Sequence, residues 1–188
     1  MTTFILASAS PRRLALLNQV GLQPSRVIAT DIDETPHKGE LPRALALRLA
    51  RQKTIAAAVS DEVVLAADTV VGCGRRILPK AESEAELVQC LDLLSGRAHI
   101  VVTGVAVAYR GVIRARAALT RVRFKRLSDA EKHSYIASGE GRGKAGGYGI
   151  QGRAERFVLS INGSYSAVVG LPLYETVGLL RHVGIVAP

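Results

Sequence analysis

Apolar runs with the length of β-strands alternate along this chain with segments of helical periodicity. The run 63–73 is almost continuously apolar and is broken by Asp68 and Thr69, a pattern typical of a strand buried on both faces. The runs 100–109 and 112–127 are separated by a short glycine turn and predict a long hairpin. Shorter runs predict further strands at residues 3–7, 26–30, 77–78 and 156–161.

Helix signals fill the intervals between these strands. Residues 41–59 are rich in Ala and Leu with Arg and Lys between them, which predicts a long helix. Ser83 with Glu86, and Ser128 with Glu131, have the spacing of capping boxes. The helices are predicted over residues 11–19, 41–59, 84–94, 129–138 and 172–183, and a loop with a short strand is expected over 163–171.

The alternation of strands and helices, with a hairpin inserted, predicts an α/β fold. We expect a mixed, twisted β-sheet with flanking helices, arranged as two lobes around a central cleft. No long linker divides the sequence, so residues 1–188 are predicted to form a single domain.

Composition and charge narrow the class of partner. Aromatic residues make up 4% of the chain and Trp is absent, which disfavours a stacking platform for single-stranded nucleic acid. The net charge of +9 suits an anionic partner such as nucleic acid, a membrane surface or a polyphosphate, and a solvated arginine-rich surface explains it equally well.

Neither a membrane anchor nor a zinc site is expected. No apolar run reaches the ~18 residues that a membrane span requires. Arg12-Arg13 is followed by too short an apolar stretch for a twin-arginine signal, so a cytoplasmic location is predicted. Cys73 and Cys90 form no CxxC pair and the four histidines have no ligand spacing, which favours a reduced protein with two packing thiols.

A phosphate site is predicted where the first strand meets the first helix. Ser8 and Ser10 precede the helix, and Arg12 and Arg13 lie in its first turn. Free backbone N–H groups and the helix dipole favour an anion there, and guanidinium groups grip phosphate oxygens bidentately. Two cations at a helix N-terminus oppose the dipole, so their placement favours a bound phosphate over a purely structural role.

Carboxylates mark a second group of candidates. Asp68 lies inside an apolar strand, where an ionised carboxylate is costly unless it is paired or bound to metal. That position is typical of a general base or metal ligand, although an Asp capping a turn gives the same pattern. The acidic loop 31–34, which ends in Glu34, is a further candidate for holding Mg²⁺ or Mn²⁺ through oxygen.

The glycine-rich segment 139–152 predicts close approach of backbone to a ligand. It contains Lys144 and Gln151, and the amide of Gln151 suits the reading of a base edge. Ser138 and Ala145 break the P-loop pattern, so a P-loop nucleotidase is excluded.

Together these segments resemble the Maf family of nucleoside triphosphate pyrophosphatases. The matching pieces, in family order, are LASASPRR (6–13), DIDE (31–34), RLARQK (48–53), AADTVV (66–71), LSG (94–96), TGVAV (103–107), KAGGYGIQG (144–152) and GSYSAVVGLPL (163–173). Pro79-Lys80-Ala81 departs from the Gly-Lys-Pro of many members, and Gly143 stands where Asp is common.

The resemblance implies a fold similar to that of the inosine-triphosphate pyrophosphatases and a homodimer. It implies cleavage between the α and β phosphates, with a divalent metal, to a nucleoside monophosphate and pyrophosphate. Asp68 matches the proton acceptor of the family, and Arg12, Thr69 and Gln151 match positions associated with substrate choice. The combination of SPRR, ADT and GIQG resembles the branch acting on dTTP and UTP.

These observations lead to one hypothesis and two alternatives. A divalent metal, Mg²⁺ or Mn²⁺, is expected on Asp68 and Glu34, with Asp68 also activating the attacking water. The alternatives are a pyrophosphatase for 7-methyl-GTP or another modified nucleotide, and a non-enzymatic protein that binds nucleic acid or regulates division. Nucleic acid is disfavoured because no binding motif accompanies the charge. The expected nucleotide-binding residues are Ser8, Ser10, Arg12, Arg13, Lys53, Thr69, Lys80 and Gln151.

Overall fold

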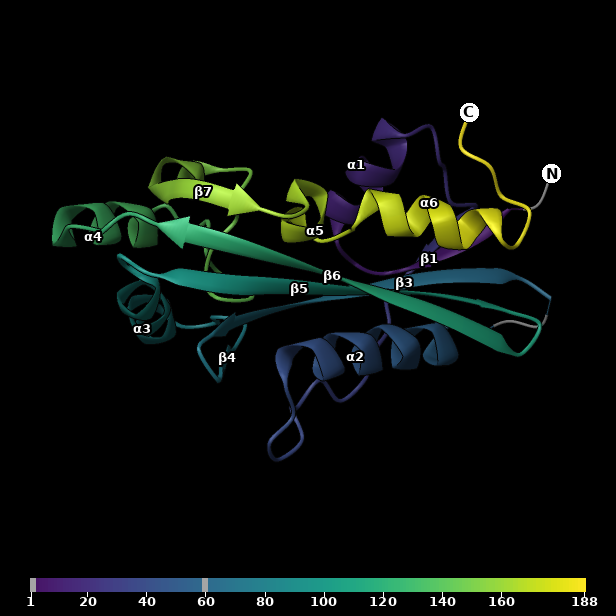
Figure 1. Ribbon diagram of the computed structural model, residues 1–188, viewed down its shortest axis with the longest axis horizontal. Helices are drawn as coiled ribbons and strands as arrows, with labels where there is room; N and C mark the ends of the chain where they lie inside the picture. The colour runs from purple at the N-terminus through teal and green to yellow at the C-terminus, as the bar shows by residue number, and fades with distance from the viewer. Residues whose placement is uncertain (1–2, 59–60) are drawn as a thin grey trace.

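The computed structural model describes residues 3–58 and 61–188 and contains a seven-stranded mixed sheet (Figure 1). The strand order is β2-β1-β3-β5-β6-β7, and β4 pairs with β3. The β1 strand is parallel to β2 and β3, and the remaining pairs are antiparallel. The strands are β1 (Phe4–Ala7), β2 (Arg26–Ile28), β3 (Val63–Cys73), β4 (Arg76–Leu78), β5 (Ala98–Tyr109), β6 (Val112–Phe124) and β7 (Val158–Asn162).

Helices cover both faces of the sheet, as predicted. Figure 1 shows α2 on one face of the long strands and α1, α5 and α6 on the other. None of the helices within the described residues is long and apolar enough to cross a bilayer. The helices are α1 (Pro11–Gln19), α2 (Pro42–Ala56), α3 (Glu84–Leu94), α4 (Asp129–Ala137), α5 (Tyr165–Val169) and α6 (Leu173–Arg181), with a 3₁₀ turn at Arg153–Phe157.

The sequence predicted most boundaries of the helices and strands closely. Ser83 and Ser128 each accept a hydrogen bond from the backbone of the glutamate three residues on, and both reciprocal capping-box bonds are present. The long helix ends at Ala56, earlier than predicted, and its expected last position, 59, lies outside the described residues. The last predicted strand begins two residues late because the 3₁₀ turn precedes it.

One predicted strand is wrong. Residues 165–169, within the segment predicted as a loop and short strand, form helix α5. Ser164 starts the helix by accepting a hydrogen bond from the backbone N–H of Ala167, and Gly170, with φ of 135°, ends it. A five-residue helix is too short to show a helical period, so the apolar residues of this segment favoured the strand prediction.

Within the described residues, the two largest apolar cores lie along the same long strands, one in each predicted lobe, and two smaller ones accompany them. One core joins β1, α1 and α6 to the first half of β3, and includes Leu65 and Ala67. The other joins α3, α4 and the glycine-rich segment to the far half of β3, and includes Val71 and Cys73. Cys73 and Cys90 are both free and buried, and burial raises the pKa of the Cys90 thiol to about 11.

Pairing along one edge of β3 is interrupted between the two lobes. The β1 strand pairs with β3 as far as Ala66, and β4 begins to pair at Val71. The opposite edge is paired with β5 throughout, from Val64 to Gly72. In the described part of the chain, no strand covers residues 67–70 on the interrupted edge. A ligand therefore has access to both faces of β3 at this gap.

Candidate active site

A cleft of about 370 Å³ opens at the gap in β3, between the two lobes. Residues that are far apart in the sequence meet there, from the loop after β1, α1, the loop after β2, α2, β3, the loop after β4, the glycine-rich segment and α5. The structure brings every residue proposed from the sequence to this cleft: Ser8, Ser10, Arg12, Arg13, Glu34, Lys53, Asp68, Thr69, Lys80 and Gln151.

The side chains of Asp68 and Thr69, which are neighbours in β3, lie on opposite faces of the sheet. Asp68 is buried and contacts Lys53 of α2. Thr69 is half-buried, and its hydroxyl lies 3.0 Å from that of Thr103 on the side covered by α5. Successive side chains of a strand alternate in direction, so these contacts follow from the strand geometry. Both side chains reach the cleft because the strand edge between them is open.

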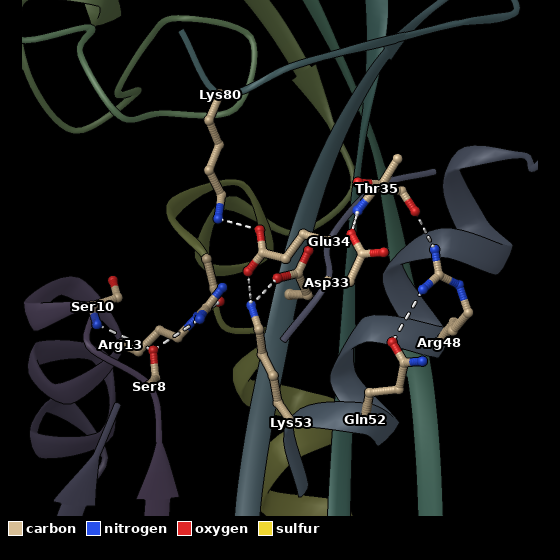
Figure 2. A network of polar contacts seen from close by, with 12 residues as sticks. Ser8, Ser10, Arg13, Asp33, Glu34, Thr35, Arg48, Gln52, Lys53 and Lys80 are labelled. Atoms are coloured by element: carbon tan, nitrogen blue, oxygen red, sulfur yellow. Dashed lines mark hydrogen bonds and ion pairs between the residues drawn. The ribbon is translucent and has the colours of Figure 1, made fainter. Parts of the chain in front are cut away.

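Lysines and carboxylates alternate across the cleft (Figure 2). The Lys53 ammonium bonds the Asp68 carboxylate and lies 2.7 Å from Oε1 of Glu34. Lys80 bonds the other oxygen of Glu34. This chain of four groups balances two positive charges against two negative ones. Lys53 and Asp68 are both buried, so each depends on the other for compensation of its charge.

Glu34 is ionised in this arrangement. Its partial burial raises the pKa, but hydrogen bonds from Lys53 and Lys80 and their positive charges outweigh burial, and the net pKa is lowered. An ionised carboxylate has oxygen lone pairs to offer to a cation.

The sequence analysis missed Arg48, which holds the loop that carries Glu34. Its guanidinium donates to both oxygens of Glu40 at 2.8 Å and to the backbone carbonyl of Thr35 at 2.9 Å. It also contacts Gln52, one turn further along α2, as Figure 2 shows. Arg48 lies in the RLARQK segment five residues before Lys53, but nothing in that spacing identifies a loop as its partner.

The start of α1 is organised by Ser8 and Arg13. Ser10 occupies the N-cap position but its side chain makes no capping bond. The Ser8 hydroxyl instead accepts from the backbone N–H of Ser10 and from Arg13, at 3.2 and 2.9 Å. Arg13 also donates to the carbonyl of Gly170 at 2.8 Å, and its burial lowers the pKa of the guanidinium. Arg13 therefore ties the helix N-terminus to the turn after α5.

The glycine-rich segment forms the wall opposite α1. Lys144, Tyr148 and Gln151 line the cleft, and Lys80 forms a β-bridge to Ala145. Gly146 has φ of 67°, and a Cβ there would lie 2.9 Å from Val71, so only glycine allows the segment to pack this closely on β3. Lys144 adds a cation that the sequence-based site did not include.

The charge of the cleft is net positive. Its lining includes five cationic side chains, from Arg12, Arg13, Lys53, Lys80 and Lys144, and two carboxylates, from Glu34 and Asp68. Such a lining is complementary to a polyphosphate.

The carboxylates of the cleft fit a magnesium-type ion. The described residues contain no group of three or more His, Cys, Asp and Glu side chains that could enclose a metal. Glu34 and Asp68 both contact the Lys53 ammonium, so their oxygens face one point. Mg²⁺ typically binds one or two carboxylates and takes its other ligands from substrate phosphates and water. The donor set therefore suits a metal that arrives with a polyphosphate.

The chain is similar to known proteins over nearly its whole length. Residues 3–183 match the family described as Maf-like protein. A protein of Caulobacter vibrioides named dTTP/UTP pyrophosphatase is 60% identical, over 96% of this chain and 95% of its own. Relatives of the same name from Hyphomonas neptunium and Sphingopyxis alaskensis are 61% and 58% identical, over 96% and 98% of this chain and 95% and 98% of their own. The HAM1 protein of Coxiella burnetii overlaps with a TM-score of 0.47 at 18% identity, over 68% of this chain and 75% of that one, too distantly to support an inference.

Proposed function

Because this chain belongs to the Maf-like protein family, we propose that its cleft hydrolyses dTTP and UTP to the nucleoside monophosphate and pyrophosphate. The observation that carries the proposal is the meeting of a buried aspartate with a cationic polyphosphate-sized cleft. The names of the relatives, which match this chain over nearly its full length, supply the substrates.

Asp68 is the proposed proton acceptor. In the reaction the oxygen of a water molecule bonds to the α-phosphorus, the bridging oxygen leaves with pyrophosphate, and the proton of the water passes to Asp68. Lys53 contacts Oδ1 of Asp68 and holds the carboxylate toward the cleft.

The cations of the cleft are the proposed phosphate ligands. Arg12 and Arg13 approach from the start of α1, and Lys53 and Lys80 from the opposite side. Negative charge moves onto the leaving pyrophosphate during the reaction, so fixed positive charges stabilise the transition state more than the substrate. Lys80 is held near Glu34 without substrate and is free to exchange that contact for a phosphate oxygen.

Glu34 and Asp68 are the proposed ligands of a divalent metal, Mg²⁺ or Mn²⁺. The ion supplies Lewis acidity at the phosphoryl oxygens when it is bound. The carboxylates of Glu34 and Asp68 would hold the ion, and Arg48 keeps the loop of Glu34 in place through Thr35 and Glu40.

Thr69 and Gln151 are the proposed contacts to the pyrimidine. They line the same cleft as the phosphate ligands, and their hydroxyl and amide groups can pair with the polar edge of a base. A polar group of the base or the site that is left without a hydrogen-bond partner costs free energy. These contacts therefore discriminate between bases.

Pyrophosphate release from a nucleotide panel tests the proposal. The panel contains dTTP, UTP, CTP, 7-methyl-GTP and ITP, each with Mg²⁺ or Mn²⁺ and with EDTA. We expect dTTP and UTP to be turned over fastest, and EDTA to abolish the activity. A preference for 7-methyl-GTP would keep the chemistry and reject the pyrimidine contacts.

Asp68→Asn is the variant that tests the chemistry. It keeps the shape of the side chain but removes the basic oxygen, so turnover is expected to fall roughly 10²- to 10⁴-fold. Asp92→Asn is a matched control because Asp92 is exposed on α3 and does not line the cleft. Full turnover by Asp68→Asn would reject the assigned role.

We also propose that the protein is a cytoplasmic homodimer. Large apolar side chains are exposed on β6, β7 and α6, including Leu119, Leu159 and Tyr174. Such residues suit a contact between copies of the chain. Sedimentation velocity at micromolar concentration tests the dimer, and a monomer throughout would reject it.

A further inference from the structure

Thr103 of β5 lies directly beneath the threonine that faces the base. It is opposite Thr69 in the β3–β5 pairing and is fully buried. Its Oγ1 lies 3.0 Å from Oγ1 of Thr69 and 2.7 Å from the carbonyl oxygen of Ala167 in α5. The Thr103 hydroxyl therefore connects the cleft-lining hydroxyl to the backbone of α5.

The direction of these two hydrogen bonds follows from the number of protons. A threonine hydroxyl has one hydrogen, and a carbonyl oxygen can only accept. The hydrogen of Thr103 is therefore directed to Ala167. In the contact between the two hydroxyls Thr103 offers only a lone pair, so Thr69 is the donor. The hydrogen of Thr69 is directed into the protein, and lone pairs of its oxygen are left for a ligand.

We propose that Thr103 determines specificity as a positioning residue: it makes Thr69 a pure hydrogen-bond acceptor, so that the cleft selects a base whose ring nitrogen N3, presented to Thr69, carries a hydrogen. The inference rests on the proposed function, in which Thr69 contacts the base. Uracil and thymine carry a hydrogen on N3 of the ring. Cytosine carries its N–H groups on the exocyclic N4 and a lone pair on N3, so with N3 toward Thr69 the two acceptor atoms oppose each other without a hydrogen between them.

This arrangement explains how a single hydroxyl separates UTP from CTP. A hydroxyl that is free to rotate either donates or accepts, and so does not distinguish the two bases. Because Thr103 is buried, its bond to α5 is shielded from water and keeps the direction fixed. A site that leaves a polar group unpaired against the wrong substrate discriminates strongly.

The test replaces Thr103 and measures a ratio. Thr103→Val keeps the side-chain shape but removes the hydroxyl, which frees the Thr69 hydrogen to turn toward cytosine. We expect the ratio of kcat/KM for UTP to that for CTP to fall about tenfold. Thr103→Ser keeps the hydroxyl, so it is expected to retain the wild-type ratio. An unchanged ratio in folded Thr103→Val overturns the inference.

A double-mutant cycle separates this role from a general structural effect. In a Thr69→Val background there is no hydroxyl left to orient, so adding Thr103→Val is expected to leave the UTP/CTP ratio unchanged. A further fall of about tenfold in that background would show that Thr103 acts by another route, and would overturn the inference.

Binding of non-hydrolysable α,β-methylene analogues of UTP and CTP gives a readout that does not depend on turnover. Wild-type protein is expected to bind the UTP analogue more tightly, and Thr103→Val to lose that preference. Equal binding by wild-type protein overturns the inference even where a variant does not fold. A wild-type preference without pyrophosphate release from UTP or dTTP would reject the proposed function alone.

Discussion

Lys53 sets the charge balance at the centre of the cleft. It is buried on α2, and its ammonium contacts Asp68 and Glu34 together. Taking a buried cation away leaves a buried carboxylate without compensation, which costs more than the ion pair itself contributes. The stability of the protein and the position of its proposed proton acceptor thus depend on one side chain.

Replacing Lys53 by an apolar side chain of similar length tests that dependence. Lys53→Met is expected to lower the free energy of unfolding by roughly 3–5 kcal/mol, because Asp68 stays buried and unpaired. Urea unfolding measures the effect. Lys132→Met removes an amine that contacts Asp92 and Asp129 at the surface, and its cost is expected to stay below about 1 kcal/mol. Equal losses in the two variants would contradict the argument.

A buried histidine makes stability depend on pH. His99 lies beneath the cleft wall, where its Nε2 is 2.8 Å from the hydroxyl of Tyr148, and burial lowers its pKa from 6.5 to about 4. The unfolded chain binds a proton at this residue as the pH falls below 6.5, and the folded chain only near 4. The stability gained from burying neutral His99 is therefore complete above pH 6.5 and is lost as the pH falls toward 4.

This linkage predicts that the free energy of unfolding varies less with pH when His99 is replaced. Between pH 7 and 5 the free energy of unfolding of wild-type protein is expected to fall by about 2 kcal/mol more than that of His99→Gln. Urea unfolding at the two pH values measures the difference. The exposed His133 serves as control, since His133→Gln is expected to keep the wild-type slope. A wild-type slope in His99→Gln would refute the prediction.

At the residue scale, functional side chains could be predicted from the sequence where their placement is energetically unfavourable. Asp68 in an apolar strand and two arginines at a helix N-terminus are unfavourable placements, and this made them visible. Arg48 and Thr103 give no such signal. An arginine on a helix and a threonine in a strand are ordinary, and their partners, Thr35 and Ala167, are 13 and 64 residues away.

At the scale of elements, the contact between α2 and the sheet positions the cleft. Gly104 of β5 lies against the backbone of α2, and a Cβ there would be 2.3 Å from the carbonyl oxygen of Ala46. The backbone of α2 comes this close to β5 only because the strand has no side chain at that point. This helix carries both Arg48 and Lys53, so its distance from β3 determines whether Lys53 reaches Asp68.

Adding one methyl group at this contact is expected to disturb the site. Gly104→Ala forces α2 away from the sheet, and we expect a loss of about 2 kcal/mol in the free energy of unfolding together with lower turnover. Thermal unfolding and pyrophosphate release measure the two effects. Gly178→Ala on α6 is the control, because a Cβ there meets nothing within 4 Å. In a helix interior that change is expected to stabilise by about 0.5–1 kcal/mol.

Elements were predictable where the local signal was strong. The run 63–73 was predicted with the bounds that β3 has, since a strand buried on both faces leaves a continuous apolar run. The two capping boxes marked α3 and α4 for a similar reason. The prediction failed at α5, whose five residues are organised by Ser164 and by the neighbouring strands.

At the scale of the whole molecule, the cleft lies between the two largest apolar cores, which are also joined by β3, β5 and Val169 of α5. Arg13 and Ser8 belong to the lobe of β1 and α1, and Lys144 and Tyr148 to the lobe of α3 and α4. The gap in the β3 pairing lies between them. A bound nucleotide that contacts both walls adds a connection between the lobes.

Nucleotide binding is therefore expected to stabilise the entire chain. At about 100 times its Kd, a ligand that binds only the folded state adds roughly 2.7 kcal/mol. For a chain of 188 residues, this corresponds to a rise in Tm of about 5–10 °C. Differential scanning calorimetry with α,β-methylene-UTP measures the shift. Uridine, which lacks the phosphates, is expected to give almost none, and equal shifts would contradict the role of the cationic wall.

The open edge of β3 has a consequence for how such a protein can diverge. Asp68 and Thr69 are adjacent in the sequence, yet Asp68 contacts α2, which carries the proposed catalytic partner Lys53, and Thr69 contacts Thr103, which bonds α5 on the side proposed for base selection. A mutation that alters one side of the strand leaves the packing of the other side intact. Descendants of one gene can therefore acquire new nucleobase preferences by small steps while they inherit the reaction unchanged.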